Sequence, residues 1–163
     1  MWSPDLEFVD EWTFPLLSES RTGVPDHMVD ACFAVGSDLR WRRNGAYIDL
    51  DRLWWTLSLH ESGAFQLGLD SSGPRPRVTS DTEGDRYLGI CLYTVALHRD
   101  LTLAEATVEI ADIVQAELTG YPPWVHWPSK DKRILFPKLV DGEAVWQDPR
   151  DGTLVARIGE LTA

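Results

Sequence analysis

The sequence predicts an α+β fold, in which a mostly antiparallel sheet carries one principal amphipathic helix, about residues 102–118, packed on one face. Three observations support this fold class: a hairpin pattern over residues 53–70, a helix with clear start and stop signals, and closely spaced turn signals after residue 130. We expect residues 1–163 to form a single domain, because a chain of this length can bury a core of its own.

The hairpin is indicated by two runs, Leu53–His60 and Ala64–Asp70, with apolar residues at alternate positions. Glu61-Ser62-Gly63 separates them. A three-residue loop that ends in glycine suits a hairpin whose last loop residue is left-handed. The two runs are therefore expected to pair as neighbouring antiparallel strands.

The principal helix has signals at both ends. Thr102 and Glu105 form a capping box, in which each side chain accepts a hydrogen bond from the backbone N–H of the other. Apolar residues follow at helical spacing as far as Leu118. Gly120 and the prolines at 122–123 then end the helix.

Four further segments have weaker patterns. A short helix is expected at about His27–Val35, and short strands at Ala46–Leu50 and Trp124–Trp127. The apolar run Tyr87–His98 fits either a buried strand or a buried helix, because periodicity alone does not separate the two. Its length and its β-branched residues favour a strand.

The C-terminal third is expected to form a meander of three strands at Ile134–Val140, Glu143–Gln147 and Thr153–Ile158. Asp141-Gly142 and the segment 149–152 are turn signals between them. Pro137 lies inside the first strand and cannot donate a ladder hydrogen bond. We therefore expect that strand to be an edge strand or to carry a bulge.

The composition is acidic, with 26 acidic and 15 basic residues and a net charge of -11. Such a charge maintains solubility, and it also attracts a basic partner. Free nucleic acid is excluded as a partner because phosphate binding needs a basic face, and Arg40–Arg43 is the one dense basic cluster. A duplex-DNA mimic is disfavoured because twelve Arg and three Lys residues interrupt the negative charge.

We expect a cytoplasmic protein with no membrane association. Its first residues lack the basic start and apolar run of a signal peptide, and no stretch approaches 18 apolar residues. Cys32 and Cys91 are too few to make a disulfide scaffold, so we expect both to be reduced and buried.

The sequence contains no recognised catalytic or cofactor motif. The histidines lack metal-ligand spacing, and the glycines form no phosphate-binding loop. We therefore expect no enzymatic activity, no metal and no cofactor, although a cysteine nucleophile paired with His98 stays open. Asp49 and Asp51 would share one face of a strand, as acid–base chemistry requires, but a solvated strand end paired with nearby arginines is the favoured explanation.

Eight tryptophans are many for one small domain, so one or two exposed ones would suit a protein-binding hot spot. The adjacent Trp54 and Trp55 are expected to face opposite sides of a strand. We expect a monomer or homodimer that binds a basic protein through acidic residues around an aromatic anchor. The candidate partner-binding residues are Asp81, Glu83, Asp85, Trp124, Trp127, Asp148 and Asp151.

The order of elements also carries a resemblance. A hairpin with Leu-Ser-Leu-His-Glu-Ser-Gly at residues 57–63 precedes the capped helix, and Thr-Gly-Tyr-Pro-Pro-Trp-Val-His-Trp follows it at residues 119–127. Over residues 50–127 this resembles the small immunity proteins that neutralise polymorphic or contact-dependent bacterial toxins, including deaminase toxins. The resemblance implies an acidic cytoplasmic inhibitor that caps a basic surface on a protein partner such as a secreted toxin domain.

Two other functions stay open. One is an accessory or adaptor domain of another bacterial system such as phage defence, with similar binding physics and a different partner. The other is a small ligand-binding domain or enzyme with a Trp-lined pocket. A deep pocket with converging Cys, His and Asp groups would favour the latter.

Overall fold

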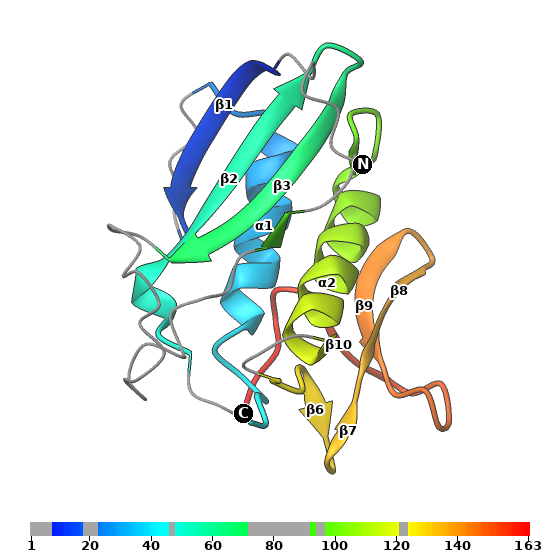
Figure 1. Ribbon diagram of the computed structural model, residues 1–163. Helices are drawn as coiled ribbons and strands as arrows, with labels where there is room; N and C mark the ends of the chain where they lie inside the picture. Colours follow the sequence, from blue (N-terminus) through cyan, green and yellow to red (C-terminus); the bar gives the residue numbers. More distant parts are fainter. Residues whose placement is uncertain (1–7, 18–22, 46–47, 72–91, 94–96, 121–123) are drawn as a thin grey trace, which may run out of the picture.

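The computed structural model describes residues 8–17, 23–45, 48–71, 92–93, 97–120 and 124–163 (Figure 1). Its main sheet is antiparallel throughout. The strands are β1 (Phe8–Pro15), β2 (Leu53–His60), β3 (Ala64–Ser71), β4 (Leu92–Tyr93) and β5 (Leu97–His98). Their order is β1-β2-β3, and both β4 and β5 pair with β3.

Two helices pack against each other beside this sheet. In Figure 1, α1 (Asp26–Asp38) crosses behind β2 and β3, and α2 (Leu103–Gly120) lies alongside α1. The other side of α2 contacts a second antiparallel sheet of order β10-β9-β8. Its strands are β8 (Phe136–Val140), β9 (Glu143–Gln147) and β10 (Leu154–Arg157). The short strands β6 (Ser129–Lys130) and β7 (Arg133–Ile134) form a separate hairpin.

The predicted α+β class is confirmed, and so are its strongest local signals. The hairpin β2–β3 turns at Gly63, whose φ is 83°. The capping box is formed: the Thr102 N–H donates to Glu105 Oε2 at 2.8 Å, and the Glu105 N–H donates to Thr102 Oγ1 at 3.2 Å. Pro137 lies in β8, which is an edge strand, as expected.

Other expectations need correction. Residues 48–50 are not a strand, because the Asp49 side chain accepts the Asp51 N–H and starts a short 3-10 helix, η1 (Leu50–Arg52). Asp49 is therefore a capping residue and not half of a paired-carboxylate strand site. In Trp124–Trp127 the pairing is a single bridge between His126 and Asn44. The predicted helix at 27–35 is longer and runs from Asp26 to Asp38.

The strands also divide among separate sheets, where one sheet was expected. Within the predicted run Tyr87–His98, the described residues 92–93 and 97–98 are strands, and the others lie outside the described residues. The alternation of Trp54 and Trp55 is confirmed, since Trp55 is fully buried and Trp54 is half-buried. Cys32 is free and buried as expected, whereas Cys91 lies outside the described residues.

The core is organised around a buried carboxylate at the end of α1. Asp38 Oδ2 accepts the Trp146 indole N–H and the Gly159 backbone N–H, both at 2.7 Å. Its Oδ1 accepts the Leu161 N–H at 3.0 Å. The backbone carbonyl of Asp38 accepts the Trp127 indole N–H at 2.9 Å. Residue 38 thus joins α1 to β9 and to the chain that follows β10.

Replacing Asp38 by Ala should lower the free energy of unfolding by about 3 kcal/mol or more, because three N–H groups, two of them buried and one partly buried, would lose their acceptor. Urea unfolding measures this loss. Asp112→Ala is the control, since it removes an exposed carboxylate from the face of α2, and it should change stability by less than about 0.5 kcal/mol. An equal effect of the two substitutions would contradict the role assigned to Asp38.

Asp38 should also give stability a defined pH dependence. Burial raises the pKa of this carboxyl in spite of its hydrogen bonds, so the folded state holds the proton to a higher pH than the unfolded chain. Asp38 therefore stabilises the folded state fully at pH values below its ordinary pKa of 3.8. This contribution to the free energy of unfolding is lost as pH rises through the raised pKa of the folded state. Between pH 4 and 7, wild type should therefore lose stability relative to Asp38→Asn. If wild type instead gained stability relative to Asp38→Asn as pH rises, the pKa of Asp38 would be lowered and not raised in the folded state.

Candidate functional site

The structure separates the residues predicted to bind a partner. Trp124 is 59% exposed, whereas Trp127 is fully buried. Asp148 is buried and Asp151 is exposed. The three acidic residues at 81, 83 and 85 lie outside the described residues, and their role stays a prediction. Of the described candidates, two remain at the surface.

Trp127 belongs to the core, which corrects its assignment as an exposed anchor. Its ring packs edge-on against Trp146, with centroids 5.1 Å apart. Its indole N–H is bonded to the backbone of Asp38. A side chain held in this way supports the fold and offers no surface to a partner.

Asp148 is likewise committed to an internal ion pair. Its Oδ1 accepts Arg150 Nε at 3.0 Å, and its Oδ2 accepts Arg150 Nη2 at 2.6 Å. This pairing holds the pKa of Asp148 well below its usual range. Asp151 is exposed, and its Oδ1 accepts the Thr153 N–H at 2.9 Å within the same turn. Asp148 therefore stabilises the β9–β10 turn and is not available to a partner.

A different acidic surface lies on α2. Glu105, Glu109 and Asp112, which we call the acidic stripe, are four and three positions apart and so share one face of the helix. Glu109 and Asp112 are exposed, and neither has a hydrogen-bond or ion-pair partner in the described part of the chain. α2 contains no Lys or Arg. The stripe therefore presents carboxylates that no basic residue of the same helix neutralises.

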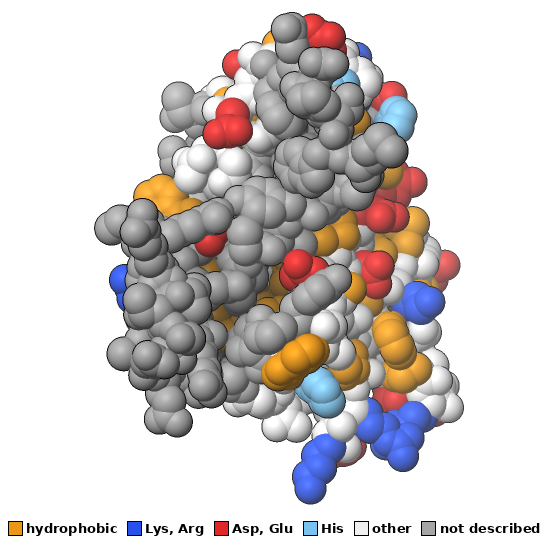
Figure 2. Space-filling model, in the orientation of Figure 1, with side chains coloured by type: hydrophobic (Ala, Val, Ile, Leu, Met, Phe, Trp, Pro, Cys, Tyr) orange, Lys and Arg blue, Asp and Glu red, His pale blue; other side chains and the backbone are white. Residues whose placement is uncertain are grey.

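The charge of the protein is unevenly distributed. Residues 129–163 contain six basic and six acidic residues, so the net charge of -11 comes entirely from residues before 129. α1, like α2, contains no Lys or Arg. In Figure 2, several acidic side chains lie over the region of α2, whereas the largest groups of Lys and Arg atoms lie at the lower end of the same view. The helical part of the molecule is thus its negative pole.

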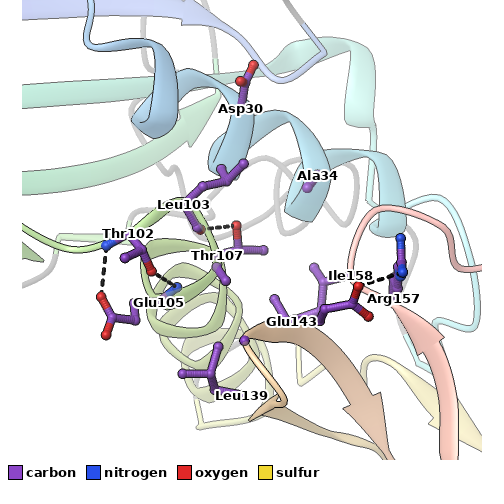
Figure 3. Close-up of a pocket in the computed structure, with 13 residues that line it drawn as sticks. Asp30, Ala34, Thr102, Leu103, Glu105, Thr107, Leu139, Glu143, Arg157 and Ile158 are labelled. Carbon is purple, nitrogen blue, oxygen red and sulfur yellow. Dashed lines mark hydrogen bonds and ion pairs between the residues drawn. The ribbon is translucent and has the colours of Figure 1, made fainter.

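Beside the acidic stripe lies an open groove of about 620 Å³. It is bounded by α1, the first turn of α2 and the β8–β9 hairpin, with the end of β10 at its edge (Figure 3). Leu103 and Leu139 line it and are 45% and 47% exposed. The other apolar residues that line it are Ala34, Ala104, Ala144 and Ile158. The groove therefore offers apolar surface that the fold leaves open.

Charged groups surround this apolar lining. Asp30 comes from α1, Glu105 from α2 and Glu143 from β9. The one cation among the lining residues, Arg157, is already paired with Glu143, with Nη2 and Oε1 2.5 Å apart. Glu105 belongs to both the groove and the acidic stripe, so the two features form one continuous surface. That surface is suited to binding a cationic group next to apolar atoms.

Sequence reasoning missed this surface. The spacing of Glu105, Glu109 and Asp112, on a helix without basic residues, is visible in the sequence and marks an acidic face. The groove has no such pattern in the sequence, because its lining residues come from α1, α2, β8, β9 and β10, which meet only in the folded chain.

The open question of a cysteine nucleophile can be addressed at Cys32. Burial raises the pKa of this thiol far above its usual range, so it stays protonated and inert. No cluster of three or more His, Cys, Asp or Glu side chains suited to a metal ion occurs among the described residues. None of the helices in the described part of the chain has the length and apolar character needed to span a membrane.

The chain was compared with family models, curated proteins and solved structures, and none of them matches it.

Replacing Trp127 by Ala should reduce the free energy of unfolding by about 3–5 kcal/mol, because it leaves a cavity next to Trp146. Trp124→Ala should change it by less than about 0.5 kcal/mol, since Trp124 is largely exposed. Chemical unfolding of the two variants distinguishes the core tryptophan from the surface one. Similar losses in both would contradict these placements.

Proposed function

We propose that this protein is an acidic cytoplasmic immunity or inhibitor protein, which neutralises a basic protein toxin by covering its active face. The observation that carries the proposal is the acidic stripe on α2 together with the apolar groove beside it. Binding interfaces combine a desolvated apolar centre with a polar rim, and this surface has both parts. It replaces the buried Trp127 and Asp148 as the expected contact region.

The physical basis is electrostatic complementarity. Toxins that act on nucleic acid need a basic face to hold phosphates, and an acidic protein is drawn to such a face from a distance. Charges at the rim of an interface mainly accelerate association, whereas buried apolar contacts slow dissociation. The stripe would thus speed capture of the toxin, and the groove would help to retain it.

A ligand-binding or enzymatic role has less support. Its expected feature was a Trp-lined pocket with converging Cys, His and Asp groups. Among the described residues that line the groove there is no Trp, Cys or His, and Asp30 is the one Asp. The proposal accordingly assigns the surface to protein binding without catalysis.

The test begins with capture of the partner from the native host, followed by expression of the partner alone and together with this protein. We expect the partner alone to arrest growth and co-expression to restore it. Purified complex should then associate more slowly as salt is raised. A partner that is not toxic, or an association rate independent of salt, would contradict the proposal.

The acidic stripe itself is tested by the triple variant Glu105→Gln, Glu109→Gln and Asp112→Asn. Gln at 105 retains the capping box, so the helix start is preserved. The variant should associate about tenfold more slowly at low salt, with a smaller salt dependence.

The charge-matched control is Asp10→Asn, Asp51→Asn and Glu160→Gln, which neutralises three exposed carboxylates on β1, on η1 and in the chain after β10. It should slow association much less, because its charges lie away from the stripe. Equal slowing by both triple variants would assign the effect to net charge and not to this surface.

A further inference from the structure

The groove combines exposed leucine side chains with carboxylates at its edge. Leu103 and Leu139 face it from α2 and β8 and keep nearly half of their surface exposed. Figure 3 shows them on different sides of the opening, with Glu105 on one flank and Glu143 on the opposite one. An occupant that only covered the leucines would leave these carboxylates partly desolvated, which is unfavourable.

The ion pair between Arg157 and Glu143 shows that the carboxylate of Glu143 accepts a guanidinium. Arg157 lies at the edge of the groove and donates from Nη2 to Glu143 Oε1. Arg157 and Glu143 are 58% and 49% exposed as side chains, so water competes strongly with the pair. A guanidinium from a partner can therefore share or replace this contact at small cost.

The occupant that fits both the exposed leucines and the carboxylates is a long cationic side chain. Its methylene stem would pack on the leucines while its charged end reaches the carboxylates at the rim. A guanidinium suits this better than an ammonium, because its planar fork of five donors can serve carboxylates on two sides, and it is more weakly hydrated.

We propose that the groove binds an arginine side chain of the basic partner, flanked by apolar neighbours; the inference rests on the proposed function for the identity of the partner. The acidic stripe continues from Glu105 along α2 and would steer the surrounding basic segment. The arginine enters between α1, α2 and the β8–β9 hairpin.

The test uses three capped peptides, Gly-Leu-Arg-Leu-Gly and the same peptide with citrulline or lysine in place of arginine. Each is titrated into the full-length protein while backbone amide shifts are followed by NMR. The arginine peptide should shift the amides around Leu103, Leu139 and Glu143, with a dissociation constant on the order of 1 mM. Citrulline has the same shape without the charge, and its peptide should bind at least about tenfold more weakly.

The apolar walls are tested by Leu103→Ala with Leu139→Ala. Both side chains are exposed enough for the protein to fold without them, and binding of the arginine peptide should weaken about tenfold. The matched control is Phe136→Ala with Leu154→Ala, which are 44% and 49% exposed on the C-terminal sheet. The control should bind the peptide like wild type.

Arg157→Gln gives a gain-of-binding readout. It frees Glu143 and removes the cation that stands among the described lining residues, so the arginine peptide should bind about threefold more tightly. A merely structural role of Arg157 would not produce tighter binding.

Equal binding of the citrulline peptide, equal binding of the lysine peptide, or weaker binding by Arg157→Gln would overturn the assignment of arginine to the groove. Neutralisation of the toxin by the Leu103/Leu139 variant at wild-type strength would overturn it as well, and would leave the proposed function intact. Conversely, arginine-specific binding by a protein that neutralises no toxin would support the groove and contradict only the proposed function.

Discussion

The carboxylate of Asp38 lies at the C-terminal end of α1, where both burial and the helix dipole disfavour a negative charge. Three N–H groups compensate, and they come from Trp146 and from the chain after β10. The group is satisfied only when the C-terminal segment is in place. Because Arg157 and Ile158 directly precede Gly159 and line the groove, the same clamp positions one wall of the candidate site.

Residue 38 also makes the burial of two tryptophans possible. A buried indole needs an acceptor for its N–H, and residue 38 provides two, its carbonyl for Trp127 and its carboxylate for Trp146. The edge-on contact of the two rings then fills the space between α1 and the C-terminal sheet. Among the described residues, the fully buried tryptophans are Trp55, Trp127 and Trp146, and a polar group inside the core accepts the indole N–H of each.

Local signals were readable from the sequence because their partners are close along the chain. The capping box joins residues three apart, and the β2–β3 turn closes over Gly63. The hydrogen bonds of the Asp38 carboxylate join residues 108 to 123 positions apart, and no local pattern encodes them. The same limit explains the site: Trp124 and Trp127 are three residues apart, and only the fold makes one exposed and the other buried.

Repulsion among the carboxylates of the acidic stripe destabilises α2. Glu105 is favoured near the start of α2, but Glu109 lies four residues after it and three before Asp112, and like charges at these spacings destabilise a helix by about 0.2–0.5 kcal/mol per pair. No Lys or Arg of α2 offsets the repulsion. Since most surfaces mix charges of both signs, a stripe of one sign beside open apolar surface is better explained by binding than by folding. A cationic partner would relieve the repulsion as it binds, so the same charges that weaken the isolated helix would favour the complex.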